Sequence, residues 1–458
     1  MRVAGLLGAN ALIVVVGMGL LPWLGVARSW RQLVARCGLA YLCGLVAVGI
    51  LAAHLALVHV SFGWPALALV SAVAAVSGAW HLRGSDRPEW TRPRWTALAA
   101  AGALAALLAE YARAFAVAPL NRYDAWAIWA LKGHALYAYG WADPTVFAGS
   151  EYRFANLDYP LLLPSLEAVD FHAMGAFDRR LLHLQFLLFL VAALAALGTV
   201  LAGHVRPLLL WTLLGAVALA PAVFDQLLTA YADLPLALVY AVGVAAAARW
   251  LLTDERWALA VATLCFAGAL LTKNEGTLFV AAAFAGLFAA AYSRRHALAV
   301  AVAVDVVLLL PWKLYVRVHH LSDINYNLAD SLHPHKLGVG PIAFRTLGGQ
   351  MLDPRQWGLL APLFVAVLVL AVLRGERALA VFAALTVLLS WLGLSWIYVI
   401  SHFEYSSYLG STKRRVVASV VLAAAALIPL LASSRRGDSD ERELLVARET
   451  GHAHPHEA

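Results

Sequence analysis

The chain has 458 residues, of which 62% are hydrophobic and 13% are charged, and its net charge is +7. Soluble domains are about 45–50% apolar and about 25% charged, so this composition leaves too few polar groups to cover a surface exposed to water. It excludes an ordinary soluble protein and predicts an integral membrane protein. The basic residues lie in short stretches between apolar runs, not in a patch interleaved with aromatics, which argues against nucleic-acid binding.

Long apolar runs recur along the chain. An α-helix needs about 20 apolar residues to cross the hydrocarbon core of a bilayer, whereas the strands of a membrane barrel are shorter and alternate in polarity. We therefore predict an all-α, polytopic bundle of about thirteen membrane-spanning helices. Their predicted ranges are 3–26, 35–59, 62–80, 96–118, 181–203, 206–222, 233–252, 257–272, 276–293, 297–316, 357–373, 378–400 and 416–432.

Arginines are concentrated in every second connection between these ranges, which places those connections in the cytoplasm by the positive-inside rule. The long loops 119–180 and 317–356 and the stretch 401–415 then face the extracytoplasmic side. Lys413, Arg414 and Arg415 stand on that side against the rule. Either they bind an anionic group such as a lipid phosphate, which arginine suits through its planar fork, or they anchor a helix end at the membrane surface.

The predicted spans divide the chain into three regions. Residues 1–95 hold additional N-terminal spans, and residues 96–432 form the main membrane domain, which includes the outer loop 119–180. Residues 433–458 are polar and mixed in charge, which predicts a disordered cytoplasmic tail.

The outer loop 119–180 brings Asp124 directly after a predicted span. This carboxylate either caps the helix that follows, or it is held at the membrane surface, where the head group of a lipid-borne substrate would lie. Trp126, Trp129 and Tyr137 follow at helical spacing. They predict a helix that lies in the membrane interface with these aromatics on one broad face.

The same loop holds further polar residues and then an apolar stretch too short to cross a membrane. Pro160 and Pro164 punctuate this stretch, which predicts a second interfacial or re-entrant helix, or a plain helix with Pro160 in its first turn. The polar candidates for substrate binding in this loop are Lys132, Glu151, Asp158 and Tyr159.

Two more polar stretches interrupt the apolar runs. Lys273 and Glu275 either form an ion pair in a tight hairpin, or Lys273 binds an anionic head group. Gly276 follows them and allows a close backbone approach or a tight turn. His402 and Tyr405, in the stretch 401–415, are additional candidates for substrate binding.

These features together resemble the GT-C superfamily of polytopic membrane glycosyltransferases. The nearest branch is the bacterial group similar to protein O-mannosyltransferases and lipid A aminoarabinose transferases. The resemblance covers residues 96–430, and its motifs are loose. Three stretches carry it, namely Tyr123-Asp124-Ala125-Trp126 through Lys132, Asp158-Tyr159-Pro160-Leu161-Leu162-Leu163-Pro164, and Leu271-Thr272-Lys273-Asn274-Glu275-Gly276.

The resemblance implies transfer of a sugar from a polyprenyl-phosphate-linked donor to a lipid, glycan or protein acceptor, on the extracytoplasmic face of a bacterial inner membrane, by inverting single displacement. It implies that Asp124 activates the acceptor hydroxyl as a general base and that Lys273, Arg414 and Arg415 hold the carrier phosphate. Family enzymes often have a second acid beside the first. Ala125 stands at that position here, so no metal ligand is assigned and the use of a divalent metal stays open.

Two other functions are weighed against the transferase. A transporter or flippase for a lipid-linked glycan is expected to carry charges inside its spans, and Glu110 and Asp305 are the main ones here. A glycan polymerase or ligase would share the outer loops but would rely on arginine and histidine, so that loss of Asp124 would matter little.

Overall fold

The computed structural model describes residues 1–85, 95–115, 117–321, 325–326, 331, 334 and 336–433. These residues form helices and connections, with one isolated antiparallel bridge between Tyr326 and Ser401. The prediction of a disordered tail falls almost wholly on residues 434–458, which lie outside the described part.

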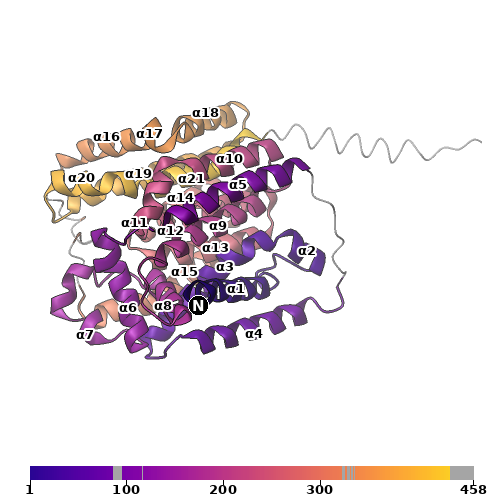
Figure 1. The fold of residues 1–458 in the computed structure, drawn as a ribbon. Helices are drawn as coiled ribbons and strands as arrows, with labels where there is room; N and C mark the ends of the chain where they lie inside the picture. Colours follow the sequence, from indigo (N-terminus) through magenta and orange to yellow (C-terminus); the bar gives the residue numbers. More distant parts are fainter. Residues whose placement is uncertain are drawn as a thin grey trace, which may run out of the picture.

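The helices run mostly side by side in one bundle (Figure 1). The short helices α6 and α7 and the helix α20 lie at one end of it, on the left of the view, and α2 lies at the other. In chain order the elements are α1 (Arg2–Leu20), α2 (Trp30–Ala35), η1 (Cys37–Leu39), α3 (Ala40–Leu57), α4 (Trp64–His81), α5 (Trp95–Phe115), η2 (Ala125–Trp129), α6 (Ala130–Tyr139), α7 (Pro144–Phe147), η3 (Ser150–Ala155), α8 (Leu162–Met174), α9 (Leu182–Leu201), α10 (Pro207–Leu219), α11 (Pro221–Thr229), α12 (Asp233–Thr253), α13 (Arg256–Thr272), α14 (Glu275–Ala290), η4 (Tyr292–Arg294), α15 (Arg295–Val318), α16 (Val339–Met351), α17 (Pro354–Trp357), α18 (Leu360–Leu373), α19 (Arg377–Ile400), α20 (Tyr405–Val416) and α21 (Ala418–Ala432).

Nine helical segments in the described residues are long and apolar enough to cross a membrane, or ten if α10 and α11, which meet at 48°, count as one bent span. The apolar helices α13, α14 and α18 are shorter. For the described residues, an all-helical architecture with apolar helices long enough to cross a membrane is therefore confirmed. Each of the predicted ranges overlaps one of these helices, and the count of thirteen spans stays a prediction.

The structure differs from the sequence-based expectation in two outer stretches. The stretch 401–415, expected as a loop, is mostly the helix α20, which continues through Val417 into α21 as one span from Tyr405 to Ala432. Glu404 starts this helix because its carboxylate accepts hydrogen bonds from the backbone N–H groups of Ser406 and Ser407. The loop 317–356 likewise contains α16, which packs on α19 through stacked rings of Phe344 and Trp391, 3.8 Å apart.

Helix α12 forms the centre of the bundle. All its residues from Asp233 to Leu251 are buried, and it packs against α9, α13 and α21. Alanine and glycine make up most of its middle stretch 241–248, which lets neighbouring helix backbones approach closely, as is typical of helix packing in membranes.

Connections predicted to share one side of the membrane lie together. Arg36, in the first connection, pairs with Glu255, in a later one, at 3.8 Å, and Arg249 donates to the carbonyl of Val200 at 2.7 Å. At the opposite end, Arg2 pairs with Asp178 of the loop 119–180 at 3.0 Å. This grouping agrees with the predicted alternation, while the assignment of cytoplasm to one end stays a prediction.

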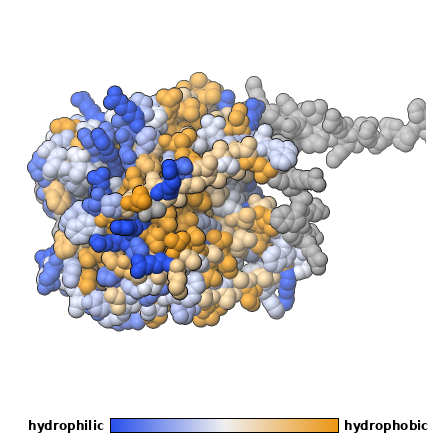
Figure 2. All heavy atoms as spheres, in the orientation of Figure 1, coloured by the Kyte–Doolittle hydropathy of each residue, from blue (hydrophilic) through white to orange (hydrophobic). Residues whose placement is uncertain are grey.

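The lateral surface of the bundle is apolar. Helix α5 buries only Phe115 among its residues, and α4, α15 and α18 also expose large apolar side chains. In the face shown in Figure 2, hydrophobic residues cover the middle, and most hydrophilic residues gather toward the end that holds α6, α7 and α20. Glu110 of α5, a charged residue inside a predicted span, forms an exposed ion pair with Arg113 at 2.7 Å.

Candidate functional site

A cavity of about 540 Å³ lies at the end of the bundle that holds α6, α7 and α20. Five chain segments far apart in sequence contribute to its wall, together with Asn325. The lining residues are Tyr123, Asp124, Ile128, Trp129, Phe154, Asn156, Tyr159, Asp233, Lys273, Glu275, Asn325, Phe403, Ser407, Tyr408, Ser411, Thr412, Arg415 and Val416.

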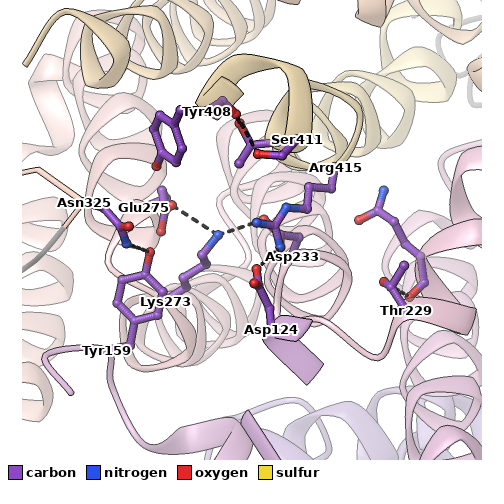
Figure 3. Close-up of polar contacts among 12 residues, drawn as sticks. Asp124, Tyr159, Thr229, Asp233, Lys273, Glu275, Asn325, Tyr408, Ser411 and Arg415 are labelled. Carbon is purple, nitrogen blue, oxygen red and sulfur yellow. Dashed lines mark hydrogen bonds and ion pairs between the residues drawn. The ribbon is translucent and has the colours of Figure 1, made fainter. Parts of the chain in front are cut away.

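Five charged side chains form a continuous network in this cavity, in the order Asp124, Arg415, Asp233, Lys273 and Glu275 (Figure 3). The Arg415 guanidinium donates to Asp124 in a short contact and lies 3.4 Å from the second oxygen of Asp233. The Lys273 ammonium lies 2.9 Å from Asp233 and 3.1 Å from Glu275. Asp233 therefore binds both cations at once.

The three carboxylates all sit where a helix begins. Asp124 directly precedes the π-helical turn η2, Asp233 is the first residue of α12, and Glu275 is the first residue of α14. Exposed backbone N–H groups give a helix start partial positive charge. The fold thus favours three negative charges at one place, and the two cations compensate them.

Lys273 lies in a two-residue connection between α13 and α14, where its backbone is extended. Gly276 makes this connection tight, because a Cβ atom there would lie 2.1 Å from the carbonyl oxygen of Ala269. The predicted close backbone approach is thus confirmed, as is the predicted ion pair with Glu275. Burial disfavours the charged lysine, but the carboxylates of Asp233 and Glu275 outweigh it and raise the pKa of Lys273 to about 12.

Helix α20 presents one polar face to the cavity. Tyr408, Ser411, Thr412 and Arg415 recur at the three- and four-residue spacing that places side chains on one side of a helix. The Tyr398 hydroxyl of α19 is 2.6 Å from that of Thr412 and fixes the rotation of α20. This spacing is the signal in the sequence that separates Arg415 from its neighbours Lys413 and Arg414.

The segment 156–159 forms the opposite wall. The Tyr159 ring stacks on Trp129 at 5.6 Å, and its hydroxyl accepts a hydrogen bond from Asn325 at 3.0 Å. Asp158 does not line the cavity and accepts a short hydrogen bond from Asn274. Burial raises the pKa of Asp158, although Lys132 and Asn274 oppose this shift. Asp158 therefore ties the wall to the connection that carries Lys273.

Lys132 lies behind this wall and is fully buried. Its ammonium donates to the carbonyl oxygens of Asn156 at 3.0 Å and Tyr159 at 3.5 Å. Burial lowers the pKa of Lys132 to about 7, and the nearby carboxylates of Asp158 and Glu167 offset this only in part. The structure thus places Lys132 where it supports the wall rather than on the cavity surface.

The expected shared face of aromatics is wrong. Trp129 is 1% exposed and belongs to the core, whereas Trp126 is 46% exposed. The π-helical turn from Ala125 to Trp129 is wider than an α-turn, so side chains three residues apart no longer point the same way. Tyr137 is half-buried and contacts Phe171 and His172.

Of the residues predicted for the site, the cavity brings together Asp124, Tyr159, Lys273, Glu275 and Arg415. Others lie outside its lining: Glu151, His402 and Arg414 are exposed, Lys413 and Tyr405 are half-buried, and Asp158 and Lys132 stand behind the wall.

Sequence reasoning missed Asp233 and Asn325. An acidic residue at the boundary of a predicted span was the available signal for Asp233, because a charge there is costly unless it is paired. For Asn325 we find no signal in the sequence.

The residues of this site do not fit a metal ion. The described chain has no group of three or more histidine, cysteine, aspartate or glutamate side chains that could hold one. Asp124, Asp233 and Glu275 are each bound by Arg415 or Lys273, whose positive charges stand where a divalent cation would have to bind. We therefore derive no step through a metal.

Comparisons with protein-family models, with curated proteins and with solved structures found no match for this chain.

Proposed function

We propose that the chain is a membrane glycosyltransferase of GT-C-like architecture. In this proposal it moves a sugar from a polyprenyl-phosphate-linked donor to an envelope acceptor at the extracytoplasmic face of a bacterial inner membrane. One observation carries the proposal: a cavity at the end of an apolar bundle combines carboxylates with two cations. A lipid-linked phosphosugar has the matching chemistry, with an apolar chain for the bilayer and an anionic head for the cavity.

The reaction that suits these groups is a single displacement at the anomeric carbon of the donor sugar. The acceptor oxygen forms the new bond to this carbon while its proton passes to the carboxylate of Asp124. The bond between the carbon and the phosphate oxygen breaks, and its electron pair leaves with polyprenyl phosphate. Attack from the face opposite the leaving group inverts the sugar.

Lys273 and Arg415 would stabilise the charge that develops on the departing phosphate. Removing one pre-positioned donor of this kind costs about a hundred- to a thousandfold in rate. Asp233 holds both cations through their nitrogen atoms, so it sets their mutual position.

The two alternative functions draw less support. A transporter needs charged groups along a route through the bundle, whereas the ion pairs that face a cavity gather at one end. Asp305 of α15 is buried within a candidate span and is the residue on which a transport hypothesis would rest. A polymerase or ligase that uses histidine finds little support in His402, which is exposed and lies outside the cavity lining.

The test is release of free polyprenyl phosphate from a panel of polyprenyl-phosphate sugars by the purified protein, with an envelope extract as acceptor. We expect release by the wild type and about a hundred- to ten-thousandfold less release by Asp124→Asn, because a general base is lost. Glu151→Gln is the matched control, since it removes an exposed carboxylate of the same loop that does not line the cavity.

Equal release by wild type and Asp124→Asn would move the base elsewhere. No release from any donor by the folded wild type would contradict the transferase and favour the transporter.

A further inference from the structure

The cavity holds more negative than positive charge. Among its described lining residues, three are carboxylates, Asp124, Asp233 and Glu275, and two are cations, Lys273 and Arg415. Both cations are already engaged: Lys273 by Asp233 and Glu275, and Arg415 by Asp124 and Asp233. A phosphate that enters this arrangement meets carboxylates that occupy the cations it needs, and like charges at such short distances repel strongly.

The carboxylates differ in how easily they could leave a cation. Asp233 is 5% exposed and Glu275 is 6% exposed, so moving either one would leave a buried cation short of a partner, which is costly. Movement of Asp233 would break two ion pairs, those with Lys273 and Arg415. Asp124 is 21% exposed, forms an ion pair with one cation among the described residues, Arg415, and precedes a short π-helical turn. Water can therefore solvate Asp124 when it leaves Arg415, and Asp233 still compensates the guanidinium.

Arg415 is prepared for a new partner. Both of its ion pairs use the same nitrogen, Nη1, and its Nε is buried without a hydrogen-bond partner in the described chain. A guanidinium binds phosphate best through two donors at once. Because Nε–H and Nη1 lie on different edges of the guanidinium, a phosphate that replaced Asp124 would bind Nη1 together with Nη2, which makes no ion pair among the described residues.

We propose that the ion pair between Asp124 and Arg415 is an exchangeable latch, in which the phosphate of the donor takes the place of Asp124 on Arg415. This rests on the proposed function and adds the order of events to it. Until the donor binds, the Asp124 carboxylate is held on the guanidinium and is not free to take the proton of the acceptor. Arrival of the phosphate releases the carboxylate into the cavity. The base thus becomes active only when a leaving group is in place.

Binding of farnesyl phosphate to the full-length protein in lipid nanodiscs tests this exchange, with farnesol as the uncharged counterpart. Asp124→Asn removes the competitor for Arg415, so we expect it to bind farnesyl phosphate about two- to fivefold more tightly than the wild type, the range for loss of a partly exposed ion pair. Glu275→Gln is the matched control: it lowers the negative charge of the cavity equally but leaves the latch intact, and we expect a smaller gain.

The outcomes separate the latch from the proposed function. If the wild type and Asp124→Asn bind farnesyl phosphate no better than farnesol, the cavity is not a site for a lipid phosphate and the proposed function is overturned. If the wild type does prefer the phosphate, equal or weaker binding by Asp124→Asn overturns the latch alone. A gain in Glu275→Gln as large as that in Asp124→Asn overturns it too, because net charge would then explain both.

Discussion

The two ends of the bundle both contain a buried cation in an ion pair, but its other contacts differ between the ends. At the end away from the cavity, Arg249 pairs with Glu255 at 2.6 Å, donates to the carbonyls of Val200 and Ala202, and lies over the Trp257 ring at 4.6 Å. The N–H groups of Arg249 that form these contacts donate to backbone carbonyls at the end of α9 and to the Glu255 carboxylate. At the cavity end, Lys273 and Arg415 face each other across one carboxylate and border an open space of about 540 Å³.

The partners of a buried cation therefore indicate whether it stabilises the fold or can bind a ligand. A cation that satisfies backbone carbonyls at a helix end stabilises that end and leaves nothing for a ligand. A cation held by carboxylates and an aromatic ring beside a cavity, as Arg415 is by Asp124, Asp233 and the Tyr231 ring, can exchange one carboxylate for a bound anion. Burial and pairing alone do not distinguish the two cases, since Arg249 and Lys273 are 8% and 7% exposed.

Lys273→Met and Arg249→Met test this distinction most strongly. Lys273→Met removes the cation of the buried Glu275 and one of the two cations bound to Asp233, and breaking a buried pair destabilises a fold by about 3–5 kcal/mol. Arg249→Met leaves Glu255, which is 30% exposed and lies 3.8 Å from Arg36, so we expect a smaller loss of stability. In the fraction that remains folded, we expect Lys273→Met to lose about a hundred- to a thousandfold in release of polyprenyl phosphate, and Arg249→Met to retain it. Release is measured on the monodisperse fraction after size-exclusion chromatography. Equal losses in both variants would mean that the two ends do not differ in role.

Lys132 sharpens the comparison, because it is a buried cation of the cavity end that donates to backbone carbonyls, as Arg249 does. Its pKa is about 7 in the folded protein and about 10.4 in an unfolded chain. Between these values the unfolded state binds more protons, so Lys132 makes stability rise with pH across this window.

Wild type should therefore gain stability relative to Lys132→Met from pH 7 to pH 9, and Lys132 itself contributes at most about 1.4 kcal/mol per pH unit. Burial raises the pKa values of Asp158 and Glu167, and Lys132 opposes this rise. Its loss raises them further, which makes the variant lose stability as the pH rises and adds to the same trend. Thermal unfolding in detergent at pH 7, 8 and 9 measures it. Arg249→Met is the control, because arginine stays charged over this range, and parallel curves for Lys132→Met would refute the assignment.

The smallest effect on release is expected at Lys413 and Arg414, which directly precede Arg415 in the sequence. Arg414→Gln and Lys413→Gln change residues that do not line the cavity, and we expect release to change less than about threefold, as for exposed charges generally. Arg415→Gln, one position further on, should lose about a hundredfold or more. Similar losses in all three variants would indicate that the basic cluster acts through its total charge, not through the contact of Arg415 with Asp233.

The sequence by itself determined the helices and their apolar faces, since these depend on local hydrophobicity along the chain. It also identified Asp124, Lys273, Glu275 and Arg415 as costly charges beside apolar runs. It did not show that 405–416 is helical, because this stretch is polar overall and its one-sided pattern has meaning only against a cavity.

Tertiary structure alone decided which of these charges meet. Asp124 and Arg415 are 291 positions apart, and Asp233 and Lys273 are 40 apart. Their contacts depend on how α12, α14 and α20 pack at one end of the bundle, and no local pattern encodes that arrangement. The same packing turned Lys132 inward behind the wall and left Lys413 and Arg414 outside the cavity, because a helix can present only one of its faces to a given space.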